Sequence, residues 1–336
     1  MDKRSTPEQL LIDELQISGT FPARYQKILL DFIASYRKAI EQGGLSFQAQ
    51  IPILRQFIQL TMEQLQSPHT FEPYHQKIKF PFDYAQFGID FILPLVDLST
   101  SHVLGQDNLD RICTQLSIGE NAVFLANHQI EPDPQAIAIL LKQSHPRLSD
   151  EIIYVAGERV ISDPLAMPFS LGTNLLCIYS KRYIDQPPEL KAQKLQHNKQ
   201  TMEKMSRLLQ EGGKAIYVAP AGGRDRPDAK GKLEPAPFDP HSIELFYLMA
   251  KKAKTPTHFY PLALSTYNLL PPPETIQQQL GETRTAKRSP IHLFVGAEFD
   301  MDHYIGSDAA DKDSRRQARA QAIWSTVKTM YDKLKK

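Results

Sequence analysis

The chain has 336 residues, of which 41% are hydrophobic, so it has the length for one large domain with a sizeable core and the composition of a folded protein. Lys and Arg total 39 against 38 Asp and Glu, which excludes the strong positive field of a general nucleic-acid-binding protein, so any anion site must be local. The cysteines are Cys113 and Cys177, without paired spacing, which favours a reducing compartment and argues against a disulfide framework or a zinc ribbon.

The sequence shows no secretory signal and no membrane-spanning segment. Its first residues, MDKRSTPEQLLIDELQ, are charged and lack the apolar stretch of a signal peptide. The densest apolar patch, IDFILPLV at 89–96, is far shorter than a bilayer span and is interrupted by Pro94. We therefore expect a protein that does not cross a membrane.

The first eighty residues predict helices. Apolar side chains recur at helical spacing in 21–44, with Pro22 near the start and a Gly-Gly pair just past the end. A second helical pattern covers 46–66, where Pro52 begins or bends the helix. The Pro- and His-bearing segment SPHTFEPYH then fits a boundary. We expect residues 1–80 to form a small antiparallel helical bundle.

From residue 81 onward, short apolar runs rich in β-branched residues alternate with stretches of helical pattern. Strands buried on both faces of a sheet have such runs, and alternation with helices favours parallel pairing. We expect residues 81–336 to form an α/β domain with a mixed, largely parallel sheet covered by helices. The predicted strands are 122–127, 152–157, 175–180, 215–220, 258–265 and 291–299, and the predicted helices are 134–145, 188–210, 239–253 and 308–335. The polar segment 271–290 is expected to be a solvated surface loop.

The stretch NHQIEPDP, residues 127–134, places a histidine and an aspartate just after a predicted strand. Five positions along one helix rotate side chains by about 140°, so His128 and Asp133 do not share a helical face. On a strand-to-helix turn, however, Asp133 can fold back to the imidazole, fix its tautomer and leave the other ring nitrogen basic. The alternative is that Asp133, followed by a proline, simply starts and caps the next helix. The pair alone leaves these two interpretations about equal.

Two more predicted strand ends carry cations. AIYVAPAGGRDRPD, 215–228, is a strand followed by a glycine turn, in which Arg224 and Arg226 alternate so that both can face one crevice. Arginine presents a planar fork of donors that suits a phosphate. YSKRY, 179–183, ends another strand with a Lys-Arg pair. Because ligands bind beyond the carboxyl ends of such strands, we expect a site for a phosphorylated alcohol there. The alternative for the arginines is a network of ion pairs that pins a loop.

Together these motifs resemble the soluble, plastid-type glycerol-3-phosphate 1-O-acyltransferases of the glycerolipid acyltransferase superfamily. The similarity rests on NHQIEPDP, VAGERV, YSKRY and APAGGRDRPD, followed by FYPLAL and PPP, and runs from about residue 20 to beyond residue 300. The H-x-x-x-x-D box marks the whole superfamily, whereas GGRDRPD is far more specific. The resemblance implies transfer of a fatty acyl group from a thioester to the sn-1 hydroxyl of glycerol 3-phosphate, which gives lysophosphatidate.

The resemblance also implies roles for individual residues. His128 is the general base and Asp133 orients it. The residues that fall where the family lines its phosphate pocket are Arg182, Tyr183, Arg224 and Arg226. The family usually has Lys-His where this chain has Arg182-Tyr183, so the arginine keeps the charge and the tyrosine keeps a donor. Pro132 stands where the family commonly has alanine.

A thioester is already activated, so the resemblance implies neither a metal nor another cofactor. The co-substrate is an acyl carrier protein thioester (acyl-ACP) or a coenzyme A thioester (acyl-CoA). Expected partners are that donor and glycerol 3-phosphate, with no nucleic acid. Because the product is an amphiphile, transient contact with a membrane surface is also expected. The expected compartment is the cytoplasm, or the plastid stroma if the sequence is a mature form.

Two other functions stay open from the residues. One is an acyltransferase that uses another acceptor, such as lysophosphatidate. The other is a phosphate- or lipid-binding protein without catalysis, in which replacing His128 by alanine leaves binding intact. Segments 89–96 and 163–172 are candidates for an acyl-chain groove, although such runs are more often ordinary core. The basic stretches 191–207 and 251–254 are candidates for docking an acidic carrier protein, although charge runs are usually solvated helix faces.

Overall fold

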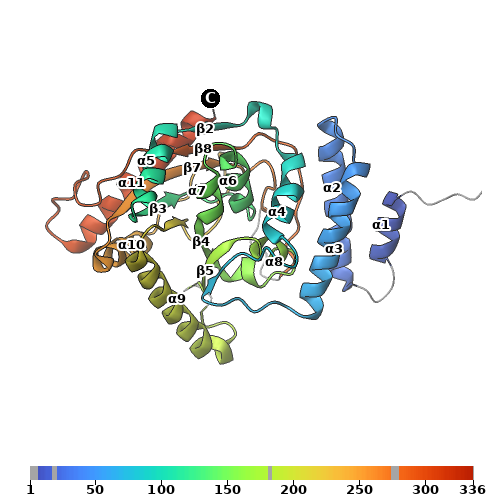
Figure 1. Ribbon diagram of the computed structural model, residues 1–336, viewed down its shortest axis with the longest axis horizontal. Helices are drawn as coiled ribbons and strands as arrows, with labels where there is room; N and C mark the ends of the chain where they lie inside the picture. The colour runs from blue at the N-terminus through green and yellow to red at the C-terminus, as the bar shows by residue number, and fades with distance from the viewer. Residues whose placement is uncertain (1–6, 17–20, 181–183, 274–279, 336) are drawn as a thin grey trace, which may run out of the picture.

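The computed structural model describes residues 7–16, 21–180, 184–273 and 280–335. Within these residues it shows one eight-stranded sheet, most of whose neighbouring strands are parallel, enclosed by helices (Figure 1). The α/β class and the largely parallel sheet predicted from the sequence are confirmed.

The sheet has the strand order β1-β5-β4-β6-β3-β7-β8-β2, with its shortest strands at the two edges. Among the described strands, the pairs β1–β5 and β7–β8 are antiparallel and the other neighbours are parallel. Strand β3 lies between β6 and β7, and all six of its residues are buried. The strands are β1 (Tyr74–His75), β2 (His102–Leu104), β3 (Asn121–Ala126), β4 (Ile153–Gly157), β5 (Asn174–Ile178), β6 (Ala215–Val218), β7 (Thr257–Ser265) and β8 (His292–Val295).

Helices cover both faces of the sheet because successive residues of its strands point to opposite sides. In β3, Phe124 packs in the core under α5, α6 and α7, whereas Val123 and Leu125 pack in the core under α9, α10 and α11. The helices are α1 (Pro7–Gln16), α2 (Ala23–Gln42), α3 (Ile51–Gln66), α4 (Tyr84–Ile92), α5 (Gln106–Ser117), α6 (Asp133–Leu141), α7 (Pro146–Glu151), α8 (Met167–Ser170), α9 (Lys191–Glu211), α10 (Pro240–Ala253) and α11 (Lys312–Leu334).

The amino-terminal helices lie at one end of the molecule, where α2 and α3 run beside α4 (Figure 1). Their apolar faces share a core with residues from beyond position 80. Phe57 of α3 packs against Phe91 of α4 and Phe169 of α8, with ring centroids 5.0 and 5.7 Å apart, and the hydroxyl of Tyr36 donates to the carbonyl of Phe91. The division into domains 1–80 and 81–336 stays a prediction.

The six predicted strands all occur, each within a few residues of its predicted bounds. The short edge strands β1 and β2 and the helices α4, α5, α7 and α8 were not predicted from the sequence. Its description of 271–290 as a solvated loop is wrong for part of that segment. Glu282 is fully buried and Ala286 nearly so, because the loop packs against the site described below.

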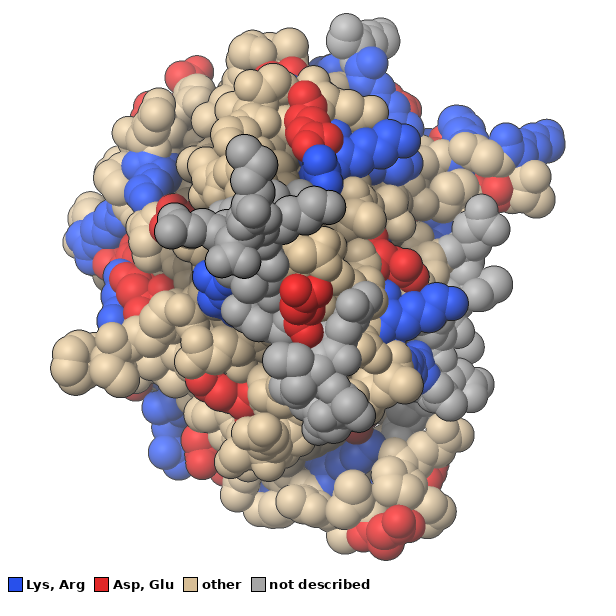
Figure 2. All heavy atoms as spheres, turned by 90° about the vertical axis from the view of Figure 1, so that its right-hand side faces the viewer, with Lys and Arg blue, Asp and Glu red and all other residues tan. Residues whose placement is uncertain are grey.

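No helix in the described ranges combines the length and the apolar character needed to cross a membrane. On the face that Figure 2 shows, basic and acidic side chains lie at several separate places among uncharged ones. That face therefore carries no broad patch of one charge in its described residues.

Candidate active site

The candidate active site lies at the carboxyl edge of the sheet, where β3, β6 and β7 end side by side. His128 lies in the turn after β3, Arg224 and Arg226 lie in the glycine turn after β6, and Thr266 follows β7. The N–H of Asp225 donates to the carbonyl of His128 over 2.6 Å and joins the first two loops. Parallel pairing thus brings together residues that are about a hundred positions apart in the chain.

His128 and Asp133 are in direct contact. Nδ1 of His128 lies 2.8 Å from Oδ2 of Asp133, whose side chain is 1% exposed, while the histidine side chain is 25% exposed. A carboxylate oxygen accepts, so in the neutral ring Nδ1 carries the proton and Nε2 is the acceptor. No described residue hydrogen-bonds to Nε2, so this nitrogen is available to a substrate hydroxyl.

Asp133 does not cap the helix that it begins. Helix α6 has no side-chain cap, and Oδ2 of Asp133 instead accepts from the N–H groups of Gln129, at 2.8 Å, and Ile130, at 3.4 Å. Its Oδ1 accepts from the hydroxyl of Thr266 at 2.6 Å. The carboxylate therefore turns back toward the loop and holds the imidazole there, and the capping alternative is wrong.

Arg224 is held by carboxylates. Its Nη2 donates to both carboxylate oxygens of Glu282, at 2.8 and 2.6 Å, and its Nη1 lies 3.8 Å from Oε1 of Glu131. The Glu282 side chain is fully buried, so this is a desolvated ion pair rather than a surface contact. Arg224 thus pins the loop that carries Glu282, as one of the two alternatives for the arginines predicts.

Arg226 has far weaker contacts. Within the described residues its Nη1 donates to the carbonyl of Arg224 at 3.4 Å, and its buried Nε has no hydrogen-bond partner. Burial lowers the pKa of Arg226, and the neighbouring Arg224 lowers it further. An anionic group would satisfy this guanidinium, because a buried donor without a partner costs free energy.

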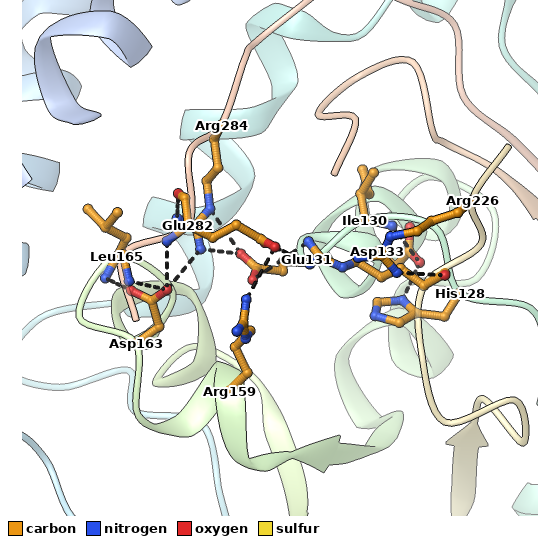
Figure 3. Close-up of polar contacts among 12 residues, drawn as sticks. His128, Ile130, Glu131, Asp133, Arg159, Asp163, Leu165, Arg226, Glu282 and Arg284 are labelled. Atoms are coloured by element: carbon orange, nitrogen blue, oxygen red, sulfur yellow. Dashed lines mark hydrogen bonds and ion pairs between the residues drawn. The ribbon is translucent and has the colours of Figure 1, made fainter. Parts of the chain in front are cut away.

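Glu131 lies between the His128 turn and a second group of buried charges (Figure 3). Nε of Arg284 donates to its Oε2 at 3.0 Å, and Nη2 of Arg284 also lies 3.5 Å from Asp163. Burial alone would raise the pKa of the Glu131 carboxyl, but Arg284 and Arg224 outweigh it and hold that pKa below its usual value. Glu131 is therefore ionised at neutral pH and fixes Arg284 in the wall of the site.

The ion pairs continue to the loop after β4. Nη1 of Arg159 lies 3.2 Å from Oε1 of Glu282, so this carboxylate links arginines from two strand ends. Asp163 accepts from the N–H groups of Leu165, at 3.0 Å, and Gly281, at 3.0 Å. The ion pairs from Asp163 to Arg159 thus form one connected network, and the His128–Asp133 pair lies beside it (Figure 3).

Arg182 and Tyr183, which the resemblance assigns to a phosphate pocket, lie outside the described residues. Of the six predicted site residues, the structure places the other four at the carboxyl edge: His128, Asp133, Arg224 and Arg226.

The acidic partners in this site were not predicted from the sequence. Glu131 carried a signal, because it lies inside the NHQIEPDP box, and Arg159 lies inside VAGERV. Glu282 and Arg284 carried none, since the polar segment around them has no periodicity and its partners lie 58 to 153 positions away.

Within the residues that the structure describes, no three His, Cys, Asp or Glu side chains are grouped so that they could hold a metal ion. His145 contacts Asp110, and His258 contacts Glu120 and Glu298, as hydrogen-bonded pairs.

Comparisons with known proteins agree with one another. The family model described as Acyltransferase matches residues 101–265, which include the His128 turn and the arginine turn. A protein named glycerol-3-phosphate acyltransferase, chloroplastic, from Arabidopsis thaliana is 32% identical over 336 residues, 99% of this chain and 73% of that protein.

Two further relatives bear closely similar names. The glycerol-3-phosphate acyltransferase, chloroplastic, of Spinacia oleracea is 35% identical over 303 residues, 89% of this chain and 64% of its own. The glycerol-3-phosphate acyltransferase ATS12, chloroplastic, of Cucurbita moschata is 33% identical over 339 residues, 100% of this chain and 73% of its own. The similarity thus extends through the amino-terminal helices as well as the sheet.

Proposed function

The chain belongs to the glycerol-3-phosphate acyltransferase family, and from this premise we propose that it transfers a fatty acyl group from a thioester to the sn-1 hydroxyl of glycerol 3-phosphate. The product is lysophosphatidate and the leaving group is the thiol of the donor. The observation that carries the proposal is the His128–Asp133 pair at the carboxyl edge of the sheet, with Nε2 of the histidine open.

In this mechanism His128 is the general base. Its Nε2 takes the proton of the sn-1 hydroxyl as the oxygen attacks the thioester carbonyl, and the imidazolium then protonates the departing thiolate. Asp133 keeps the proton of the neutral ring on Nδ1 and stabilises the imidazolium by its charge. The reaction needs no cofactor, because the thioester is an activated acyl donor.

We assign the phosphate of the acceptor to the arginine turn. Arg226 supplies donors that have no strong partner among the described residues, which supports a direct contact with the phosphate. Arg224 is shared with Glu282 and acts chiefly by its charge and by holding the loop. Arg182 and Tyr183 complete the pocket in this proposal.

The donor is an acyl-ACP or an acyl-CoA. An acidic carrier protein fits the basic face of α9 only in part, because Lys194 is buried and donates to Glu158 and Lys191 pairs with Asp185, whereas Lys199 and Arg207 are exposed. Lys251, in the other basic stretch, pairs with Asp302. We place the reaction in the cytoplasm or the plastid stroma, with transient membrane contact through its amphiphilic product.

The test is acyl transfer by the purified protein to glycerol 3-phosphate, with acyl-ACP and acyl-CoA offered separately and His128→Ala run alongside. We expect lysophosphatidate from the wild type and a loss of at least about a hundredfold in the variant. Offering lysophosphatidate as acceptor tests the nearest alternative enzyme.

The outcomes separate the candidate functions. Product from lysophosphatidate but not from glycerol 3-phosphate would reassign the acceptor. Equal rates for wild type and His128→Ala would remove His128 from the chemistry, and no transfer with any donor would leave a binding protein.

A further inference from the structure

Asp225 lies between the two arginines of the turn after β6, yet its side chain is fully buried and points to the interior. An isolated carboxylate is costly to bury, so its contacts must compensate for the lost water. Those contacts go to the two residues on either side of His128, namely Asn127 and Gln129.

The first contact has a fixed polarity. Oδ1 of Asn127 accepts from the N–H of Leu264 at 2.7 Å, and its Nδ2 donates to the carbonyl of Leu264 at 3.0 Å. This pairing with β7 sets which end of the amide is nitrogen. The same Nδ2 donates to Oδ2 of Asp225 at 2.8 Å, so Asp225 must accept there.

The second contact is fixed in the same way. Oε1 of Gln129 accepts from the N–H groups of Thr266 and Tyr267, at 2.7 and 2.9 Å. Its Nε2 is therefore left to donate, to Oδ2 of Asp225 at 3.3 Å and to the hydroxyl of Tyr331 on α11 at 3.1 Å. Both amides beside His128 aim donors at one carboxylate oxygen.

The backbone closes the arrangement. Oδ1 of Asp225 accepts from the N–H of Ala236 at 2.8 Å, and the N–H of Asp225 donates to the carbonyl of His128 at 2.6 Å. Both oxygens of the Asp225 carboxylate thus face N–H donors. An asparagine in its place would put its own N–H group against one of these donors.

From these contacts we propose that Asp225 is a positioning residue, which holds the His128 turn and the turn of Arg224 and Arg226 at a fixed separation for the transfer reaction. The inference rests on the proposed function. It assigns to the arginine turn a second task besides binding phosphate. The distance between the base and the phosphate donors is set through Asp225, which touches neither substrate.

The charge of Asp225 fits this task. Burial raises its pKa to about 6, against the lowering effect of its bonds to Asn127, Ala236 and Gln129 and of nearby His128. At neutral pH the group is an anion, and an anion is the form that all of its donors require.

The test uses Asp225→Asn, which keeps the shape and reverses the polarity of one side-chain atom. Displacement of reacting groups by an ångström costs about a hundredfold in rate, so we expect kcat/KM for glycerol 3-phosphate to fall about 10- to 100-fold. KM for glycerol 3-phosphate rises, because the arginines move, while KM for the thioester stays within about twofold. The matched control is Asp239→Asn at the start of α10, an exposed aspartate that also accepts from backbone N–H groups.

A purely structural role gives a different result. Loss of folded protein would lower the apparent kcat and leave both KM values unchanged, and that outcome overturns the positioning role. So does a Asp225→Asn protein with wild-type kinetics. If the wild type shows no transfer, the proposed function fails and the positioning role fails with it. If the wild type is active, the kinetics of the variant test the positioning role alone.

A second variant decides the case if Asp225→Asn does not fold. Tyr331→Phe removes the hydroxyl that holds Nε2 of Gln129, far along the chain on α11. We expect kcat/KM for glycerol 3-phosphate to fall about three- to tenfold. The matched control is Tyr260→Phe, another buried tyrosine whose hydroxyl bonds a glutamine, Gln115, at the other edge of the sheet. Equal kinetics for these two variants would overturn the proposal.

Discussion

A histidine lies at each end of the neighbouring strands β3 and β7, and the two histidines differ in their contacts. At the carboxyl edge, His128 follows β3 and has one ring nitrogen bound to Asp133, with the other open. At the amino edge, His258 near the start of β7 has both nitrogens bound, Nε2 to Glu120 at 2.8 Å and Nδ1 to Glu298 at 2.7 Å. Both rings contact carboxylates, so proximity to a carboxylate does not distinguish them.

The difference lies in what is left unpaired. Both ring nitrogens of His258 are occupied by carboxylates, so neither is open to a substrate and the ring links the ends of two loops. His128 keeps one acceptor nitrogen, and Arg226, in the turn that is bonded to the His128 carbonyl, has an Nε without a hydrogen-bond partner. Chemistry is expected where the fold leaves polar groups unsatisfied, and cross-linking where it satisfies all of them.

Removing one carboxylate charge at each edge of the sheet tests whether the two histidines differ in function. Asp133→Asn removes the anion that stabilises the imidazolium of His128, and we expect kcat to fall about a hundredfold. Glu298→Gln should leave kcat within about twofold. Steady-state acyl transfer measures both, and comparable losses from the two variants would contradict the distinction between the edges.

The ion pairs beside the site allow a stability test. Arg284→Ala leaves Asp163 buried without this cation and leaves Glu131 with only the more distant Arg224, so we expect the free energy of unfolding to fall by about 3–5 kcal/mol in urea titrations. The control is Arg147→Ala, which removes an exposed pair with Glu151 in one helix and should cost about 0.5 kcal/mol or less. A loss below about 1 kcal/mol for Arg284→Ala would show that the network is not needed for folding.

Asp225 gives an effect on stability that has a definite sign with pH. Its folded pKa of about 6 lies above the ordinary 3.8, so the folded state binds more protons than the unfolded state between these values. Stability from this group therefore falls as pH rises from about 4 to about 6, by roughly 3 kcal/mol in all.

Urea titrations of wild type and Asp225→Asn over that pH range measure this effect. The difference between the two free energies of unfolding should shrink as pH rises. A difference that stays constant with pH would mean that Asp225 titrates normally.

The sequence predicted much of the scaffold and one part of the site. Continuous apolar runs such as AVFLAN predict buried strands because a strand covered on both faces has no polar side. The off-helix spacing of His128 and Asp133 predicts a turn in which they can meet, with helix capping by Asp133 as the equal alternative. These inferences rest on the spacing of residues close together in the chain, so they need no knowledge of long-range contacts.

The same local information failed for the segment after β7. The residues around Glu282 look like a solvated loop, because polar residues without periodicity give no sign of burial. Their partners are Arg224 and Arg159, 58 and 123 positions away. Only folding brings these charges together, and only then does burial become favourable.

By itself, the sequence determined the α/β class and the order of most strands and helices, and it placed His128 and Asp133 on one short turn, because each follows from side-chain periodicity or from turn residues. Whether Asp133 caps the helix or turns back to His128 was decided by the tertiary structure. The tertiary structure alone decided which arginine is held by a carboxylate and which keeps an unpaired donor. It also decided that Asp225 faces inward to the amides beside His128. Those outcomes depend on the parallel alignment of β3, β6 and β7, since long-range pairing of strands sets which buried donors and acceptors face one another.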